Sequence, residues 1–351
     1  MVQDRSVPSN LHREIHEQPE VLSRLFENET GAVARLAKKW RGRDIEYVTI
    51  AARGSSDNAA SYGKYLFGAH NRLPVALPAP SLLTLYGARP NLQRSLVIAI
   101  SQSGASPDIL AVVEEARAQN VPSLAITNSP SSPLAGIADD VLCLHAGEER
   151  SIAATKSFTA SLAALAMISV ALEGEGSSGR LDELLAIPQK MSAALAVDVT
   201  SLVPLFVDLR YCPVIGRGFN HATAFEIALK MKELSYLGAE AYSPADFLHG
   251  PIAMVDERLY ALVVAPHGKT YPNLTELIHR MKNEGAHVVA ISDRDEMIAL
   301  AGAGARVPEV PEWLSPLVTV IAGQLLALAL TEAKGFDVDR PRRLMKVTKT
   351  V

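Results

Sequence analysis

Residues 95–120 decide the fold, and their sequence is SLVIAISQSGASPDILAVVEEARAQN. The first part, SLVIAI, is a mostly apolar run with the composition of a strand that is buried on both faces. The last part has helical spacing, with Ser106 predicted as the N-cap and Pro107 at the first helical position. A strand that leads through a short polar loop into a helix is the repeating unit of a doubly wound α/β sheet.

The same unit recurs along the chain at nearly constant spacing. Pairing Ile50 with Ile215, Ile100 with Val264 and Ile126 with Ile291 gives offsets of 165, 164 and 165 residues. Offsets this similar indicate a duplicated domain, so we predict two doubly wound parallel-sheet domains of the α/β class. The further strands are expected in YVTIAARGSS (47–56), PSLAITNSP (122–130), CPVIGRGFN (212–220), LYALVVAPHG (259–268) and HVVAISDRD (287–295).

The composition of the remaining segments predicts where the domains begin and end. LHREIHEQPEVLSRLFENETGAVARLAKKW (11–40) has the pattern of an amphipathic helix that covers a sheet, and LEGEGSSGRLDELLAIPQKM (172–191), rich in Gly and Ser and then helical, has that of a linker. We therefore expect a helical segment at 1–30, a first domain at 31–185, a second domain at 200–338 and a tail at 339–351 that closes over the site.

The composition also argues against several classes of function. A net charge of -4 without a dense basic cluster argues against a nucleic-acid partner. The N-terminus lacks a basic segment followed by an apolar one, and polar residues interrupt the apolar runs, so we expect a cytoplasmic protein without a membrane partner. Cys143 and Cys212 lie in apolar segments typical of buried thiols, and the nine histidines form no zinc-binding pattern, which predicts no metal.

Two hydroxyl-rich loops follow predicted strands, at the edge where such sheets bind ligands. The loop SQSGAS places Ser101, Gln102, Ser103 and Ser106 beside the positive end of a helix, which is an arrangement that binds phosphate. The loop RGSSDN (53–58) repeats the arrangement with two serines. Either loop alone could equally be a helix cap and turn, but two on neighbouring strands favour phosphate binding. Neither has the glycine spacing of a nucleotide site.

A possible acid–base group lies in HATAFEIALKMKELSYLGAEAYSPADFLHGP (221–251). Glu226, Lys230 and Glu233 are spaced four and three residues apart, which places them on one helical face. Solvated ion pairs are the default explanation, whereas the apolar neighbours favour a buried helix in which a glutamate could have a raised pKa and act as a general base. His249 lies in a rigid Gly- and Pro-rich loop that could present its imidazole to a ligand.

Another loop, AGEERSIAATKSFT (146–159), precedes a strongly apolar helix. Thr155 is predicted to cap that helix, and Lys156 could face an anion or solvent, of which the residues alone favour solvent. Neither residue indicates a function by itself.

Together, RGSS, SQSGxS, ATKSFT, ALKxKE, AEAY…HGP and PRRLMK resemble, in the same order, the isomerase half of glucosamine-6-phosphate synthase. The resemblance extends from residue 13 to the end, and so many ordered motifs identify the chain as a member of the double-SIS (sugar isomerase) family. The resemblance implies a homodimer, a sugar phosphate as ligand, no cofactor, and site residues shared across the dimer interface.

The resemblance also assigns roles to individual residues. Glu233 would move a proton between carbons 1 and 2, supported by Lys230, while His249, from the other subunit, would open the sugar ring. Lys346 would engage the open-chain sugar. The phosphate would be held by Ser56, Ser101, Gln102, Ser103 and Ser106. The sugar would contact Gly54, Ser55, Ala153, Thr155 and Glu226.

The departures from the synthase pattern refine the expected reaction. Val2 follows Met1 where a synthase has a glutaminase domain, so we expect no ammonia source in this chain. Arg53, Ala154 and Leu248 replace a thiol, a serine and a lysine. The motifs ARGSSD, SQSGxSPDI, AGEE and FLHGP are closer to stand-alone SIS-type glucosamine-6-phosphate deaminases, which implies conversion of glucosamine 6-phosphate to fructose 6-phosphate and ammonia.

Several alternatives share the same loops. They are another aldose–ketose phosphosugar isomerase, an ammonia-dependent synthase, a fructosamine-phosphate deglycase and a non-catalytic sugar-phosphate sensor. The sensor is disfavoured because the sequence has no N-terminal helix-turn-helix segment and no basic face.

Overall fold

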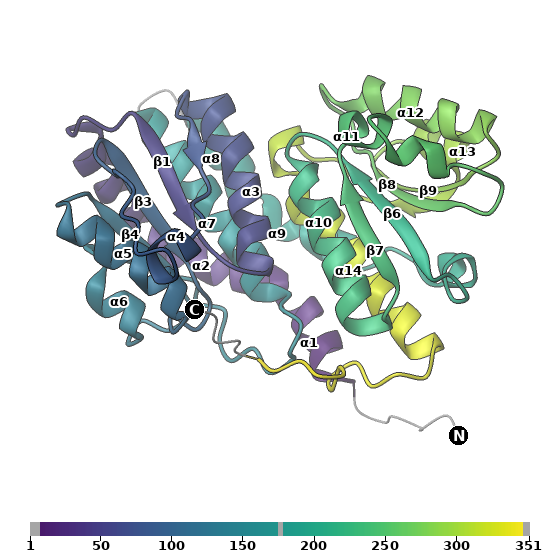
Figure 1. Cartoon of the computed structure of the whole chain (residues 1–351). Helices are drawn as coiled ribbons and strands as arrows, with labels where there is room; N and C mark the ends of the chain where they lie inside the picture. Colours follow the sequence, from purple (N-terminus) through teal and green to yellow (C-terminus); the bar gives the residue numbers. More distant parts are fainter. Residues whose placement is uncertain (1–7, 175–177, 347–351) are drawn as a thin grey trace. The chain divides into compact units, whose positions relative to one another are not determined.

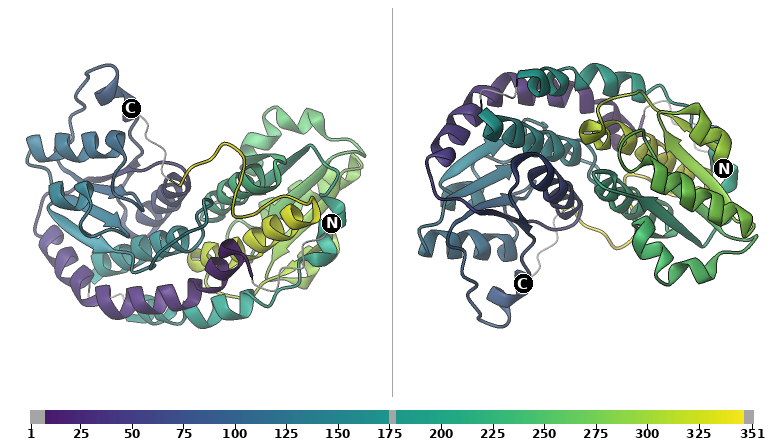
Figure 2. Two further views of the ribbon diagram at one scale, coloured as in Figure 1. Left: turned by 90° about the horizontal axis from the view of Figure 1, so that it is seen from below. Right: turned by 90° about the horizontal axis from the view of Figure 1, so that it is seen from above.

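The computed structural model describes residues 8–174 and 178–346, which fall into two compact units. Each unit contains one five-stranded parallel sheet with helices on both faces (Figures 1 and 2). The predicted α/β class with two doubly wound sheets is therefore confirmed. The sheet A unit comprises Glu20–Glu149, Lys156–Ala186 and Met345–Val351, and the sheet B unit comprises Met1–Pro19, Arg150–Thr155 and Ile187–Leu344.

Sheet A has the strand order β2-β1-β3-β4-β5, and its central strands are almost fully buried. Gly63 of α3 lies close to both Ile50 of β1 and Leu165 of α7, which places α3 and α7 on one face of the sheet. The strands are β1 (Tyr47–Ala51), β2 (Val75–Ala76), β3 (Ser95–Ile100), β4 (Ser123–Thr127) and β5 (Asp140–Cys143). The helices are α2 (Gln18–Arg41), α3 (Ser55–Leu66), α4 (Ser81–Thr84), α5 (Pro107–Ala118), α6 (Pro133–Ile137), α7 (Lys156–Glu173) and α8 (Ser178–Leu185).

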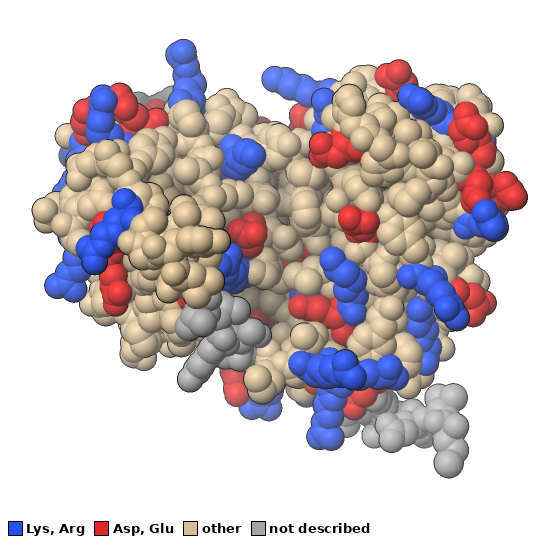
Figure 3. All heavy atoms as spheres, in the orientation of Figure 1, with Lys and Arg blue, Asp and Glu red and all other residues tan. Residues whose placement is uncertain are grey.

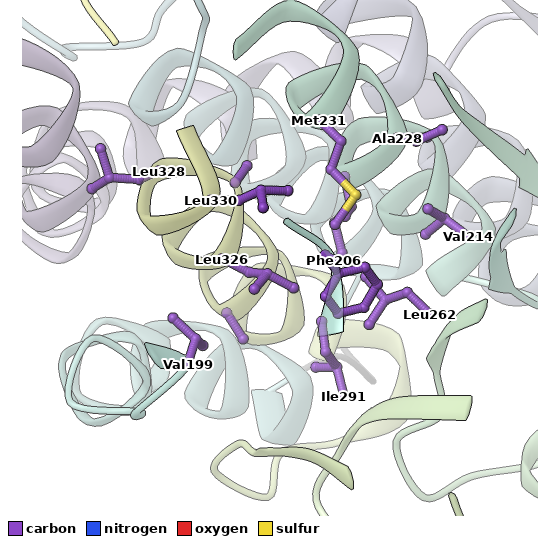
Figure 4. Close-up of a cluster of buried hydrophobic side chains, with 14 of the residues drawn as sticks. Val199, Phe206, Val214, Ala228, Met231, Leu262, Ile291, Leu326, Leu328 and Leu330 are labelled. Carbon is purple, nitrogen blue, oxygen red and sulfur yellow. The ribbon is translucent and has the colours of Figure 1, made fainter. Parts of the chain in front are cut away.

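Sheet B has the order β10-β9-β8-β6-β7, and alternate residues of its strands enter two different cores. One core lies between the sheet and helices α10 and α14 and contains Phe206, Met231 and Leu326 (Figure 4). The strands are β6 (Tyr211–Gly216), β7 (Gly238–Tyr242), β8 (Tyr260–Val264), β9 (His287–Ser292) and β10 (Gly302–Arg306). The helices are α1 (Asn10–His16), α9 (Ile187–Ala194), α10 (Asn220–Lys230), α11 (Pro244–Leu248), α12 (Tyr271–Asn283), α13 (Asp295–Ala301) and α14 (Pro316–Ala333).

The two units are copies of one design. Read from β7, the strand order of sheet B matches that of sheet A read from β2. Helices α3 and α10 both continue into a π-helical turn, η1 (Phe67–Asn71) and η4 (Met231–Ser235), and each turn ends at a left-handed residue. Those residues, Arg72 and Tyr236, are 164 residues apart, which is one of the offsets predicted from the sequence. The internal duplication is therefore confirmed.

One expectation about local structure is wrong. The N-terminal amphipathic segment forms two helices, because α1 ends at a C-cap, Glu17, before α2 begins. The segment predicted as a linker with a helical second part contains α8 and the start of α9, so its helical part is confirmed. Residues 1–7 of the N-terminal segment, 175–177 of the linker and 347–351 of the tail lie outside the described residues.

Two helices correct the expectation that no apolar segment reaches membrane-spanning length. Lys156–Glu173 and Glu312–Ala333 have 18 and 22 residues with mean hydropathies of 1.3 and 1.9, which is long and apolar enough to cross a membrane. However, 83% and 94% of the most apolar 18 residues of these two helices are buried inside the protein. Their apolar side chains therefore form the cores of the two units.

The surface agrees with the composition, and one of the two thiols is less buried than predicted. On the face drawn in Figure 3, acidic and basic side chains are interspersed. Cys143 and Cys212 are both free thiols, but only Cys212 is buried, whereas Cys143 is partly exposed. Burial raises the pKa of Cys212 to about 12, so this thiol stays protonated at neutral pH and is a poor nucleophile.

Candidate functional site

The two serine loops lie at the same edge of sheet A. They follow β1 and β3, which pair directly in parallel, so both loops leave the sheet at its carboxyl end. Gly54, with a φ of 58°, precedes α3 and brings Ser55 and Ser56 into the first helical turn. The structure therefore brings the predicted phosphate-binding serines of both loops to one region of the sheet A unit.

Ser106 occupies the predicted position before α5 but does not cap the helix. Its side chain makes no capping hydrogen bond, whereas Pro107 begins the helix as predicted. The backbone N–H groups of Ala105 and Ser106 donate no hydrogen bond to any of the described residues. These donors at the positive end of α5 are thus available to an anionic ligand.

The loop between β3 and α5 has a fixed backbone. The Ser101 hydroxyl accepts a hydrogen bond from the Gly104 N–H at 3.1 Å, and the Gln102 carbonyl accepts one from the Asn128 N–H at 3.1 Å. Gly104 has a φ of 62°, and a Cβ atom there would lie 2.0 Å from the Ser132 hydroxyl. Only glycine fits this position without displacing Ser132.

The equivalent loop of sheet B holds an anion from the chain itself. It connects β8 to α12, and its Thr270 follows Ser106 by 164 residues. There the Glu312 carboxylate accepts hydrogen bonds from the Lys269 N–H (3.0 Å), the Thr270 N–H (3.3 Å) and the Thr270 hydroxyl (3.3 Å). This loop geometry is therefore suited to binding an oxyanion. In the sheet B unit the Glu312 carboxylate occupies that position.

The predicted acid–base residues form a buried charged cluster in the sheet B unit. The Lys230 ammonium lies 3.4 Å from Glu226 Oε1 and 2.6 Å from Glu233 Oε2. The side chains of Glu226 and Lys230 are 0% and 1% exposed, and that of Glu233 is 22% exposed. The shared helical face is confirmed, and the default explanation of solvated ion pairs is wrong. Only Glu233, in the π-helical turn, is open to a ligand.

The charge on Lys230 is maintained despite its burial. Loss of hydration lowers the pKa of this ammonium, but Glu226 and Glu233 outweigh that effect, and the pKa is raised above its usual value. In the sheet A unit, the residues that correspond to these three charged residues at an offset of 164 are Tyr62, Leu66 and Ala69. The charged cluster is therefore confined to one copy.

The loop after β5 contains a buried acid that the sequence analysis did not single out. Glu149 accepts hydrogen bonds from the Ser157 N–H (3.1 Å), the Ser157 hydroxyl (2.8 Å) and the Lys346 ammonium (2.8 Å). The proposed tail lysine is thus paired with a carboxylate. Lys156 does not face solvent as predicted, because it is buried and donates to the Glu148 carbonyl at 2.8 Å.

The remaining candidates differ in exposure. Ala153 and Thr155, expected to contact the sugar, are buried in the sheet B unit. His249 is exposed at the end of α11, and its backbone N–H donates to the Asp246 carbonyl at 3.1 Å. In the part of the chain that the structure describes, no group of three or more His, Cys, Asp or Glu residues could hold a metal ion.

Comparison with known proteins agrees with the duplicated fold. A family model described as SIS domain matches residues 43–171 and 212–331. An isomerizing glutamine–fructose-6-phosphate aminotransferase from Thermus thermophilus is 36% identical over 357 residues, covering 97% of this chain and 58% of its own length. The chain thus spans less than two thirds of the length of the curated relatives that it matches.

Solved structures give the same result. The C-terminal domain of glucosamine-fructose-6-phosphate aminotransferase from Francisella tularensis has a TM-score of 0.86 and 27% identity, covering 97% of this chain and 100% of that one. Glucosamine-6-phosphate deaminase from Thermotoga maritima has the same fold, with a TM-score of 0.79, 22% identity and coverage of 97% and 100%. The chain therefore belongs to the SIS domain family, with two SIS segments, and is homologous to the isomerase domain of glutamine–fructose-6-phosphate aminotransferases.

Proposed function

We propose that this chain is a cytoplasmic phosphosugar-processing enzyme that converts glucosamine 6-phosphate and water to fructose 6-phosphate and ammonia. The observation that carries the proposal is the cluster of Lys230 with Glu226 and Glu233. A buried ion cluster is a weak source of stability, and strongly interacting buried charges with one accessible member are typical of catalytic sites. The relatives named as isomerizing aminotransferases support an amino-sugar phosphate as substrate.

The phosphate would bind at the serine loops of sheet A. The unused N–H groups of Ala105 and Ser106 support this role, as does the carboxylate that the equivalent sheet B loop holds. The full set of proposed phosphate ligands is Ser56, Ser101, Gln102, Ser103 and Ser106. The proposed sugar contacts are Gly54, Ser55, Ala153, Thr155 and Glu226.

The proposed reaction is an isomerisation followed by hydrolysis. His249 assists opening of the sugar ring, and the Glu233 carboxylate takes the proton from carbon 2 and returns it to carbon 1. The nitrogen then forms an imine with carbon 2, water adds to that carbon, and ammonia leaves. Lys230 offsets part of the negative charge of the two carboxylates around it, and Lys346 contacts the open-chain carbonyl. No cofactor is needed, because the carbonyl and amine of the substrate supply the reacting groups.

The proposal includes a homodimer in which His249 acts on the sugar held by the partner subunit. It also keeps the functional division into two SIS domains, at 31–185 and 200–338, and a tail at 339–351 that closes over the bound sugar. Exposure of the His249 side chain on the described surface supports such a role.

A substrate panel tests the proposal. Purified protein is incubated with glucosamine 6-phosphate, N-acetylglucosamine 6-phosphate, glucose 6-phosphate and unphosphorylated glucosamine, and ammonia and ketose phosphate are measured. We expect ammonia and fructose 6-phosphate from glucosamine 6-phosphate and no reaction of unphosphorylated glucosamine. A ketose formed without ammonia would favour a simple isomerase. Binding without turnover of any sugar phosphate would favour a sensor.

A further inference from the structure

The C-terminal tail is anchored to the sheet B unit by an arginine packed on two aromatic rings. The Arg342 guanidinium lies 4.7 Å from the centre of the Tyr236 ring and 5.1 Å from that of the Phe336 ring. The backbone N–H of Arg342 donates a hydrogen bond to the Tyr236 hydroxyl at 2.8 Å. The two rings also contact each other, with centroids 4.9 Å apart. We call this group the tail clasp.

Tyr236 has a left-handed backbone conformation at the end of a π-helical turn. It has a φ of 55° and ends the π-helical turn that contains Glu233. A non-glycine residue in this conformation costs free energy, roughly 1–3 kcal/mol, and persists only where its surroundings hold it. The corresponding residue of the first copy, Arg72, has the same backbone conformation but no ring. The ring is therefore present in the copy on which the tail lies.

A second contact holds the tail just before the clasp. The Asp339 carboxylate accepts hydrogen bonds from the N–H groups of Asn10 (2.9 Å) and Leu11 (3.0 Å) at the start of α1. The chain is thus fixed at Asp339 and again at Arg342. Lys346 follows Arg342 by four residues, so its Cα can lie at most about 14 Å from that of Arg342.

We propose that Tyr236 and Arg342 are positioning residues for Lys346. The clasp restricts the tail, and Lys346 is thereby presented to the open-chain sugar with less conformational freedom to lose. A cation held over aromatic rings, together with one hydrogen bond, contributes enough to change the population of a docked segment about tenfold. This inference rests on the proposed function, because the role of Lys346 belongs to it.

Four variants test the clasp. We expect Arg342→Met to lower kcat for ammonia release about tenfold with a smaller change in KM. Arg342→Lys, which keeps a cation over the rings, should restore part of the loss, and Tyr236→Phe should lower kcat by a few fold because it removes only the acceptor. The matched control is Arg343→Met, which removes the next arginine of the tail and should leave kcat unchanged. Equal kcat values for Arg342→Met and Arg343→Met would overturn the proposal.

Hydrogen exchange separates this inference from the proposed function. In Tyr236→Phe the amide of Arg342 loses its acceptor, so we expect its exchange to accelerate about tenfold or more, while amides of β6 and β8 are unchanged. An unchanged exchange rate would contradict the clasp whether or not the protein releases ammonia. If the wild type turns over no sugar phosphate but the Arg342 amide still exchanges faster in Tyr236→Phe, the proposed function is wrong, whereas the anchoring of the tail by the clasp is supported.

Discussion

The Lys230 ammonium lies 2.6 Å from the carboxylate of Glu233, which follows three residues later in the middle of the π-helical turn η4. The ammonium is fully buried, whereas the carboxylate reaches the surface. The Glu233 carboxylate is therefore held in position by a buried cation.

Replacement of Glu233 by glutamine should abolish turnover and preserve affinity. The amide has nearly the same shape but cannot take the proton from carbon 2, so we expect ammonia release to fall by about 100-fold to 10,000-fold. The Kd for fructose 6-phosphate, measured by calorimetry, should change less than about threefold. Glu257→Gln, which alters an exposed glutamate in a loop, serves as the control and should behave like the wild type. A Glu233→Gln variant with near-normal ammonia release would contradict the assignment.

Replacement of Lys230 by methionine should strongly destabilise the sheet B unit. It leaves two carboxylates without their buried counter-ion, and breaking such a cluster costs about 3–5 kcal/mol of unfolding free energy. Urea denaturation followed by circular dichroism measures the change. An unfolding free energy within about 1 kcal/mol of the wild type would show that the two carboxylates do not need their buried counter-ion.

The same variant gives a pH prediction. Because the pKa of Lys230 in the folded protein is raised above its ordinary value of 10.5, its contribution to the free energy of unfolding is fully present below that pH and is lost as pH rises through the folded value. The stability difference between wild type and Lys230→Met should therefore shrink above about pH 10.5. A difference that grows with alkaline pH would contradict the raised pKa.

Replacement of Gly104 by alanine should damage the β3–α5 loop specifically. The added Cβ would meet the Ser132 hydroxyl at 2.0 Å, and the residue would keep a φ of 62°. Gly87→Ala is the matched control, because it has a similar φ of 61° but no heavy atom within 4 Å of the added Cβ. We expect Gly104→Ala to destabilise the protein by about 2 kcal/mol more than the control and to raise KM for the sugar phosphate. Equal melting temperatures of the two variants would contradict this account of the loop.

Mixed dimers test the sharing of site residues. Glu233→Gln and His249→Ala should each be inactive alone. If His249 serves the partner's sugar, a heterodimer of the two variants contains one intact site of two, so the purified heterodimer should have about half of wild-type activity and the random mixture about a quarter. Co-expression with two affinity tags isolates the heterodimer for the ammonia assay. No recovery in the purified heterodimer would place His249 in the site of its own subunit.

The central strands could be predicted from the sequence, and three edge strands could not. Buried strands such as SLVIAI have continuous apolar runs. In contrast, β10 has the sequence GAGAR, and β2 has only two residues, so neither shows a strand signal. Strand β7, GAEAY, was included in a segment whose helical spacing dominated the prediction.

The site was predictable where its residues are close in sequence. The spacing of Glu226, Lys230 and Glu233 places them on one face, and the structure shows how deeply they are buried. Contacts across long separations left no such signal: Lys346 and Glu149 are 197 residues apart, and Arg342 and Tyr236 are 106 apart. Lys156 was misjudged because its partner is a backbone carbonyl, which no side-chain pattern reveals.

The most direct test of the central claim uses glucosamine 6-phosphate deuterated at carbon 2, with ammonia measured by assay and deuterium followed by NMR. The account predicts ammonia and fructose 6-phosphate in equal amounts, with the deuterium transferred to carbon 1 or released to water. Ammonia accompanied by a sugar phosphate that retains deuterium on carbon 2, or no ammonia at all, would contradict it.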